Sequence, residues 1–188
     1  MRKLKELVNL QAGSPQFRIK ETSNGQTYYF YGQENLRADL VGTEEKTTRE
    51  ITTDEEVCII EEGDLVISLI NPICAVVGKR QAGMLLTQNF VKLNPKYPVD
   101  KRYLAFLINE DKSVRRQLIS ETSSAVNKIT INILGNIEIP ELPNIEVQRI
   151  IGDVYMQQKR LTLLKKQESE LEETYIIESM KGIVHNDK

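Results

Sequence analysis

The sequence has little of the chemistry that most enzymes need: one histidine, two cysteines and no tryptophan in 188 residues. The one histidine, His185, lies close to the C-terminal end, so the rest of the chain has no imidazole for a Ser-His-Asp or Cys-His arrangement. Cys58 and Cys74 cannot supply the four ligands of a thiolate zinc site, and no histidine is near them in sequence. Both cysteines lie in apolar, strand-like runs, which predicts buried reduced thiols.

Long hydrophobic runs are also missing. No stretch approaches the roughly 20 apolar residues that span a bilayer, and Met1–Glu6 lacks the apolar core of a signal peptide. We therefore expect a cytoplasmic protein without a membrane partner. Apolar residues make up 40% of the sequence, which is enough for one core with a projecting element but not for two full domains.

Net charge is low, at −2, but it is unevenly distributed along the chain. Residues 1–38 carry six Lys and Arg against three Asp and Glu, and residues 75–130 carry ten against four. Residues 39–64 carry two against ten, and residues 138–188 carry seven against ten. Two basic segments can present a phosphate-attracting face on a chain that is acidic overall. The alternative, ordinary solvated surface charge, stays open from the sequence.

Hydrophobic periodicity changes near residue 144, which we take as the domain boundary. Strand-like runs separated by turn residues precede it; they are Tyr28–Tyr31, Val57–Ile60, Leu65–Ile70, Ala75–Gly78 and Asn89–Leu93. Asp100 is a candidate N-cap for a helix through Ile108, and a further helical stretch covers Val114–Ile119. The sequence therefore predicts an α+β fold, with a β-rich domain over residues 1–143 and one or two packed helices.

One long helix is predicted over residues 144–180, followed by a disordered tail over residues 181–188. Some 35 helical residues make a rod of roughly 50 Å, longer than a body of this size requires. The helix fits a heptad pattern that is interrupted at Gln157, Glu168 and Glu178. The candidate pairing residues are Val147, Ile150, Val154, Gln157, Leu161, Leu164, Leu171 and Tyr175. Length and register favour a coiled-coil-forming helix over one that lies along its own domain.

Known catalytic and binding motifs are not found. Asn71-Pro72-Ile73-Cys74 matches the base-gripping tetrapeptide of amino methyltransferases at only two of four positions, and a turn between strands explains it better. Neither a phosphate-binding G-x-x-x-x-G-K-[ST] loop nor an H-E-x-x-H zinc motif occurs. The acidic run Asp54–Asp64 lacks the alternating ligands of a calcium loop and is expected to be a solvated edge. A binding or assembly role is favoured over an enzyme.

Several stretches, in this order, carry a resemblance to a known family. They are Glu62–Ser68, Thr87–Pro95, Tyr103–Leu107, Ser123–Leu134 and Ile137–Ile151. Together they resemble the target recognition domain of a type I restriction-modification specificity (S) subunit and its hand-over to a conserved spacer helix. That helix commonly opens with a Glu-Gln pair, whereas here Val147 separates Glu146 from Gln148.

The resemblance implies a half-length specificity subunit, with one recognition domain and one spacer helix. It implies a non-catalytic chain that binds double-stranded DNA and docks a modification methyltransferase, with a restriction nuclease as a further partner. S-adenosylmethionine would be bound by the methyltransferase, and this chain would bind no cofactor or metal. We expect a homodimer through the C-terminal helix that recognises a bipartite site with inverted half-sites.

Candidate DNA contacts are polar or basic residues at predicted loops and strand ends. They are Arg18, Lys20, Asn71, Lys79, Arg80, Gln81, Ser123, Asn127 and Lys128. Two other functions stay open: a protein-binding adaptor that is dimerised by its coiled coil, and an inactive truncated specificity cassette. An adaptor would show no salt-dependent DNA binding, and a truncated cassette would be monomeric or poorly soluble.

Overall fold

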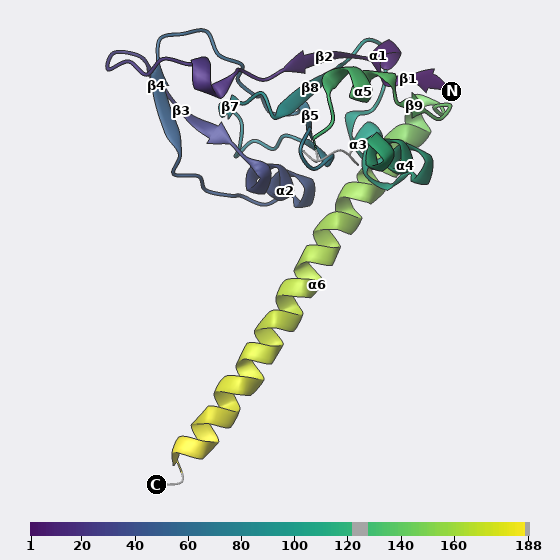
Figure 1. The fold of residues 1–188 in the computed structure, drawn as a ribbon. Helices are drawn as coiled ribbons and strands as arrows, with labels where there is room; N and C mark the ends of the chain where they lie inside the picture. The colour runs from purple at the N-terminus through teal and green to yellow at the C-terminus, as the bar shows by residue number, and fades with distance from the viewer. Residues whose placement is uncertain (122–127, 187–188) are drawn as a thin grey trace.

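The structure is a computed structural model that describes residues 1–121 and 128–186. Its elements in chain order are β1 (Arg2–Lys3), α1 (Leu4–Leu7), β2 (Val8–Ala12), η1 (Gln16–Arg18), β3 (Gln26–Tyr31), α2 (Gln33–Val41), β4 (Glu50–Thr53), β5 (Leu65–Ser68), β6 (Cys74–Val76), β7 (Leu85–Leu86), β8 (Phe90–Pro95), α3 (Lys101–Glu110), α4 (Lys112–Glu121), α5 (Ile131–Asn136), β9 (Glu138–Ile139) and α6 (Ile145–Asn186). Short strands and helices form a body, and α6 leaves it as a long rod (Figure 1). The predicted α+β fold with a long C-terminal helix is confirmed.

A four-stranded antiparallel sheet in the order β2-β8-β5-β6 lies at the centre of the body. Successive side chains of a strand point to opposite faces, and both faces of β5 are covered. Leu65 and Ile67 belong to a core cluster shared with α3, whereas Val66 belongs to a second cluster shared with α2. The uninterrupted apolar run of β5 therefore reflects a central strand between two layers.

A three-stranded sheet in the order β4-β3-β7 builds the other end of the body. β3 pairs antiparallel with β4 and parallel with β7, which joins segments far apart in the sequence. Tyr31, at the end of β3, is buried against Phe90 of β8 with ring centroids 5.5 Å apart. This sheet is thus tied to the central one through aromatic packing.

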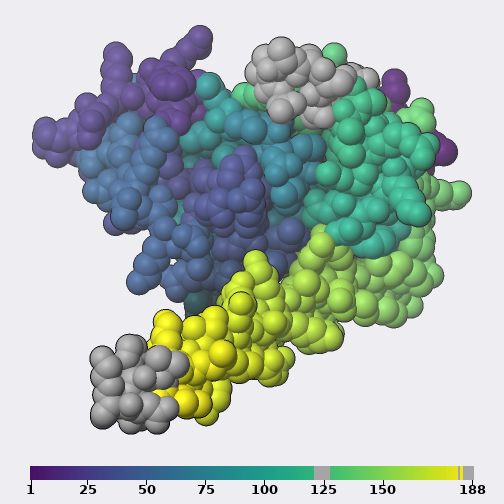
Figure 2. Space-filling model, turned by 60° about the horizontal axis from the view of Figure 1, so that its bottom comes forward, coloured from purple at the N-terminus to yellow at the C-terminus, as the bar shows by residue number. Residues whose placement is uncertain are grey.

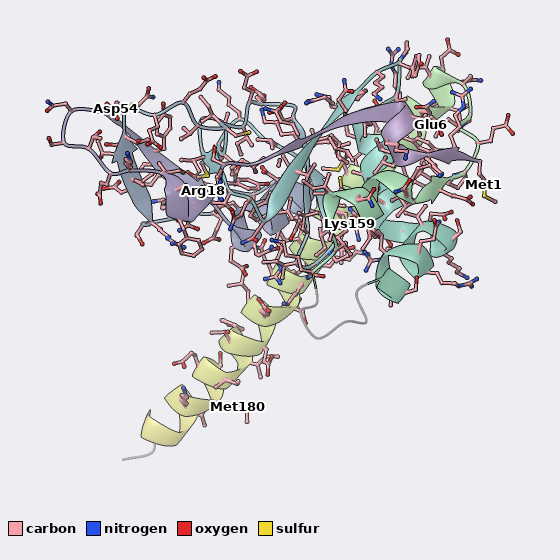
Figure 3. The ribbon with its side chains drawn as sticks, turned by 45° about the horizontal axis from the view of Figure 1, so that its top comes forward. Met1, Glu6, Arg18, Asp54, Lys159 and Met180 are labelled. Carbon is pink, nitrogen blue, oxygen red and sulfur yellow. The ribbon has the colours of Figure 1, made fainter. Side chains whose placement is uncertain are left out.

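The N-terminal segment joins the opposite end, beside the start of α6. β1 pairs antiparallel with β9, and the Leu4 amide donates to the Ile137 carbonyl at 2.9 Å. Figure 3 shows Met1 and Glu6 at this end and Arg18 and Asp54 at the end built by β3 and β4. The first residues of the chain therefore hold the segment at residues 137–139 that leads into α6.

Helix α3 forms as the sequence predicts. The Asp100 carboxylate accepts from the Tyr103 amide at 2.9 Å and caps the helix. At its other end Asn109 completes the exposed edge of β6, because its side chain accepts from the Cys74 amide at 2.8 Å and donates to the Cys74 carbonyl at 2.7 Å. The Asn109 side chain thus satisfies the backbone donor and acceptor of Cys74, which a neighbouring strand would otherwise bond.

Other local predictions had mixed outcomes. The turn at Asn71–Cys74 is confirmed between β5 and β6. The strand predicted over Val57–Ile60 is wrong: only Ile59 makes an isolated bridge, to Leu85, and the strand in this region is β4. The run at 57–60 is apolar because Ile60 is buried in the second core cluster. Burial rather than strand pairing explains its composition.

Helix α6 is longer than predicted. It continues to Asn186, past the expected end at residue 180, because Gly182 alone does not stop a helix that has no following proline. Residues 187–188 of the predicted tail lie outside the described residues. Within the described part of the chain, no helix is both long and apolar enough to cross a membrane.

Candidate nucleic-acid interface and helix surface

The root of α6 packs against α3 at a point where only glycine fits. A Cβ built on Gly152 would lie 2.7 Å from Asp100 Oδ1 and 2.8 Å from the Tyr103 amide nitrogen. Glycine lowers helix propensity, but at position 152 its missing side chain lets α6 approach α3 closely. This contact brings α6 directly onto the capped N-terminus of α3.

Two further side chains of the same helix face fix α6 to the body. Gln148 is buried, donates to the Pro143 carbonyl at 2.7 Å and accepts from the Asp100 amide at 3.1 Å. Tyr155 is 7% exposed, accepts from Asn109 at 2.9 Å and packs edge-on against Phe106. Burial raises the pKa of the Tyr155 hydroxyl, which therefore stays protonated at neutral pH.

At the edge of the body this attachment ends. Lys159 forms an ion pair with Glu110 at 2.7 Å and lies 5.3 Å from the Tyr155 ring centroid. Lys159 is labelled at the point where the helix leaves the body, and Met180 lies far along the projecting part (Figure 3). Figure 2 shows the distal turns standing clear of the body. The helix therefore does not lie along its own domain beyond its first turns.

The predicted pairing residues form a stripe on the opposite face of α6. Gly152 faces the body, and Val154, two residues on, lies about 200° further around the helix. Ile150 and Val154 are 63% and 60% exposed although they lie in the attached turns. Leu171 and Tyr175, in the projecting turns, are 70% and 75% exposed. The remaining members, Val147, Gln157, Leu161 and Leu164, are exposed as well. A continuous outer face thus runs the length of the helix without a partner in the described structure.

A hollow of about 220 Å³ with mixed polar and apolar lining opens on the body where the two sheets meet. Amide, hydroxyl and guanidinium groups line it beside aromatic rings; the residues are Gln16, Phe30, Tyr31, Gly32, Gln33, Thr47, Arg49, Ile70, Thr87, Asn89 and Phe90. The Arg49 guanidinium lies 5.0 Å from the Phe30 ring centroid and has no ion pair among the described residues. Such a set can donate to and accept from base edges.

Some of the predicted DNA contacts lie around this hollow. Lys128 donates from Nζ to Asn89 Oδ1 at 2.8 Å, and Asn71 is exposed in the turn that begins beside Ile70. Arg18 is exposed at the end of η1, the short helix that brings Gln16 into the hollow. Lys20 is exposed nearby in sequence, where its amide donates to the Glu55 carboxylate at 3.3 Å. Ser123 and Asn127 lie outside the described residues.

The remaining predicted contacts lie elsewhere and do not form one face with these. Lys79 and Arg80 follow β6, at the end of that strand opposite to Asn71. Arg80 forms an ion pair with Glu44 at 2.9 Å. Gln81 is wrongly placed by the sequence prediction: it is 1% exposed and donates to the Thr43 carbonyl at 3.2 Å. Its side chain supports the loop after α2 instead of facing solvent.

Beside Gln81 lies a buried carboxylate that the sequence prediction missed. Asp39 accepts from the Tyr31 hydroxyl at 2.7 Å and from the Gly78 amide at 2.8 Å. Burial raises the pKa of Asp39 to about 6, although both hydrogen bonds act to lower it. Burial also raises the pKa of the Tyr31 hydroxyl, which therefore stays protonated and donates a hydrogen bond to Asp39. The pair joins α2 to the end of β3.

Charge is less segregated in space than along the chain. The basic segment 75–130 and the acidic segment 39–64 pair with each other, through Arg80 with Glu44 and through Lys92 with Asp64 at 2.6 Å. The basic segment therefore does not form a continuous face, because part of its charge is neutralised within the body. Cations without an ion pair among the described residues include Arg18, Lys20, Arg49, Lys79 and Lys128.

Both cysteines are free thiols; Cys74 is buried and Cys58 is half-buried. Burial raises the pKa of each thiol, so neither is primed as a nucleophile. Within residues 1–121 and 128–186, no group of three or more His, Cys, Asp or Glu side chains could hold a metal ion.

The lining of the hollow was not found from the sequence. Gln33 opens α2 two residues after β3, Arg49 precedes β4 and Asn89 precedes β8, so the only local signal was a polar residue near a strand end. What brings these strand ends together is the pairing of distant strands. That pairing has no local signature in the sequence.

Comparisons with known proteins agree with this architecture. A family model of the type I restriction modification DNA specificity domain matches residues 1–173. The HsdS subunit from Thermoanaerobacter tengcongensis superposes with a TM-score of 0.54 at 21% identity, over 88% of this chain and 39% of that one. The type-I restriction-modification S subunit from M. genitalium gives 0.52 at 16% identity, over 94% and 42%. A chain from a structural study of complex assembly and conformational transition of the type I R-M system gives 0.66 at 16%, over 92% and 45%.

The chain spans less than half the length of each of these three structures. None of the curated proteins compared with it matches. At these identities the solved structures establish the fold, and the family model, which covers most of the sequence, establishes the family. The chain belongs to the family of type I restriction modification DNA specificity domains.

Proposed function

We propose that this chain is a DNA sequence-specificity subunit of a type I restriction-modification system. The observation that carries the proposal is the geometry of α6. One face is fixed to the body by Gly152 and Tyr155, and the opposite face exposes an apolar stripe along the whole helix. A rod held rigidly at its root and unpartnered outside suits a spacer that sets the distance between two recognition bodies.

The body supplies DNA contact in this proposal, through the hollow between the two sheets and the cations around it. Asn and Gln side chains can pair with both a donor and an acceptor on an adenine edge, and Arg with two acceptors on guanine. Gln16, Gln33, Asn89 and Arg49 line the hollow and would offer these groups, and exposed Arg18 and Lys20 would contact phosphates. Gln33 donates to Ser68 Oγ at 2.6 Å and Asn89 accepts from Lys128, so DNA would use their remaining donor and acceptor capacity. Phosphate contacts would position the body, and the hollow would supply the sequence preference.

Two bodies would be needed for a bipartite site. We propose that α6 pairs antiparallel with α6 of a second copy and places the bodies at opposite ends of the helix pair. Two identical bodies related by a twofold axis would recognise identical half-sites in inverted orientation. The exposed stripe from Val147 to Tyr175 is the surface that would be covered.

The chemistry would come from other subunits. We propose that a modification methyltransferase, carrying S-adenosylmethionine, docks on the helix pair, and that this chain binds no cofactor itself. Ile176, Met180 and Ile183 lie outside the heptad stripe and are 57%, 60% and 67% exposed, so an apolar surface remains after pairing. A restriction nuclease would join through the methyltransferase or beside it.

Sequencing of methylated bases tests the proposal. A host that expresses this chain with its modification methyltransferase should gain methylated adenines in a motif of two separated half-sites. Exchange of residues 1–143 for those of another family member should change the half-sites while the two-part form of the motif remains. Unchanged methylation in the presence of both subunits would contradict the proposal. An adaptor without DNA contact, or an inactive cassette, would give that result.

A further inference from the structure

The stripe on α6 has polar residues at two inner positions, and their placement carries information about pairing. Gln157 and Glu168 each occupy a seam position, are exposed, and have no hydrogen bond or ion pair among the described residues. They lie at equal distances from the midpoint between residues 162 and 163. Leu161 and Leu164 flank the same midpoint, and a shallow hollow lies between Leu164 and Leu171 beside it.

We propose that two copies of α6 pair antiparallel in one specified register, with the twofold axis passing between Thr162 and Leu163. This inference rests on the proposed pairing and adds which residues meet. Leu161 then faces Leu164 of the second copy, and Gln157 faces Glu168 of the second copy. The Gln157 amide can donate to the Glu168 carboxylate, so each interruption satisfies the other.

The next two layers of the seam are apolar in this register, and the outermost layer places Val147 against Glu178 of the second copy. Val154 meets Leu171 of the second copy, and Ile150 meets Tyr175 of the second copy. The twofold axis repeats each contact, so polar faces polar and apolar faces apolar from residue 150 to residue 175. At the outer end of the pair, Glu146 comes beside Lys181 of the second copy, with opposite charge.

A slide by one heptad in either direction loses this match. One slide places Gln157 against Leu161 and Glu168 against Ile150, and it brings Arg160 beside Arg160 of the second copy. A polar group without a partner and two like charges at short range both disfavour that register.

The opposite slide is equally mismatched. It places Glu168 against Leu164 and Gln157 against Tyr175, and it brings Lys165 beside Lys165 of the second copy. In the proposed register Arg160 and Lys165 face glutamines, Gln167 and Gln158. Charge along the flanks therefore selects the same register as the seam itself.

Parallel pairing is disfavoured for a related reason. In a parallel, in-register dimer each seam residue meets its own copy, so Glu168 would face Glu168 across the interface. On the flank, Arg160 would face Lys165 of the second copy. Like charges in the seam and on its flank therefore disfavour parallel pairing relative to the proposed register.

The register fixes the separation of the two bodies. Each α6 begins at Ile145, about 17 residues before the axis, so the two helix starts lie roughly 50 Å apart along the pair. Because Gly152 and Tyr155 fix each body to its helix, this distance would be transmitted to the two DNA-contacting hollows. The gap between half-sites would follow from it.

Disulfide crosslinking between differently tagged chains tests the register. The background carries Cys58→Ser, and Cys74 stays because it is buried. Mixed chains with Val154→Cys and Leu171→Cys should form a heterodimer disulfide on mild oxidation. Matched controls are Val154→Cys with Leu164→Cys for one slide, Leu161→Cys with Leu171→Cys for the other, and Val154→Cys alone for parallel pairing.

We expect the first combination to crosslink at least about fivefold more than any control, because one heptad moves the backbones by roughly 10 Å and disulfides need Cα atoms within about 7 Å. Strong crosslinking in a control instead would overturn the register while leaving the dimer. Light scattering of the same samples separates the two ideas: a monomeric chain that crosslinks in no combination would overturn the proposed pairing itself.

A second variant tests the role of the polar pair. Gln157→Leu with Glu168→Leu makes the seam continuously apolar, so the dimer should persist while crosslinks become spread over the control combinations. A double variant that keeps the selectivity of the parent chain would show that the two polar residues do not set the register.

Discussion

Asp39 holds a carboxylate at a position with little access to water, and its charge state should govern part of the stability of the body. Its pKa is raised from 3.8 to about 6, so folding favours the protonated form. The stabilisation of the folded state by protonated Asp39 is fully present below about pH 4 and is lost as the pH rises through 6. Relative to a variant without this carboxylate, the free energy of unfolding should fall by on the order of 2 kcal/mol between pH 4 and pH 8.

Asp39→Asn should remove that loss. The amide oxygen can still accept from the Gly78 amide, and the amide nitrogen can donate to the Tyr31 hydroxyl oxygen. Urea unfolding at pH 4 and pH 8 measures the difference, with the exposed Asp54→Asn as the matched control. If Asp39→Asn follows the same pH profile as the parent chain, the buried carboxylate does not cause the pH dependence.

The junction between α3 and α6 depends on glycine, which has no side chain, at position 152. Gly152→Ala should improve intrinsic helix formation by about 1 kcal/mol. The added methyl group, however, would lie 2.8 Å from the Tyr103 amide nitrogen, which is backbone and cannot move aside cheaply. We expect a net loss of about 1–3 kcal/mol in the free energy of unfolding.

Thermal or urea unfolding checks this expectation, with Ser169→Ala on an exposed turn of the same helix as the control. The control should be neutral or slightly stabilising. A Gly152→Ala chain as stable as the parent would mean that α6 can shift on α3, and the rigid attachment of the spacer would then be wrong.

The outer face of α6 should no longer pair with a second copy when charged residues replace its central apolar layer. Leu161→Asp with Leu164→Asp places two carboxylates in each copy at the proposed twofold axis and should turn the dimer into a monomer. Light scattering gives the mass directly. Thr162→Asp with Ser169→Asp adds the same charge outside the seam and should leave the dimer intact; loss in both variants would indicate general repulsion rather than a defined seam.

The sequence predicts some helices and strands better than others. Elements whose stabilising contacts lie within a short stretch of sequence are predicted, whereas elements held by distant residues are not. The Asp100 cap and the heptads of α6 lie within short windows, so their periodicity is visible. α2 was not predicted, because Leu36 and Leu40 are a weak apolar pattern and the helix is held by Asp39 bonding to Gly78. β7 is only two residues long and exists through its parallel pairing with β3.

On the scale of the whole molecule, folding brings acidic and basic segments together, so the surface charge differs from the charge totals of the segments. The segment totals predicted a basic face, yet Glu44 and Asp64 neutralise part of it. The hollow lies where distant strand ends meet, so Arg49 and Asn89 could not be singled out from the sequence. The family resemblance suggested the proposed function, and the structure brings together the residues that we propose carry it.

Arg49 should contribute to DNA affinity. Arg49→Gln removes a cation beside the hollow and should weaken binding about 3- to 10-fold near 0.1 M salt, with a shallower salt dependence if the contact is to phosphate. Fluorescence anisotropy over a salt series measures both effects on the complex with the methyltransferase. Lys166→Gln on the exposed helix is the control, and equal effects of the two variants would place the DNA away from the hollow.

The central claim is that two bodies, held apart by paired helices, select DNA together. Selection of bound sequences from a randomised duplex library, with the purified chain and its methyltransferase, tests this most directly. The expected result is enrichment of two identical half-sites in inverted orientation, separated by a constant gap of unselected bases. No enrichment, or a single uninterrupted site, would contradict it.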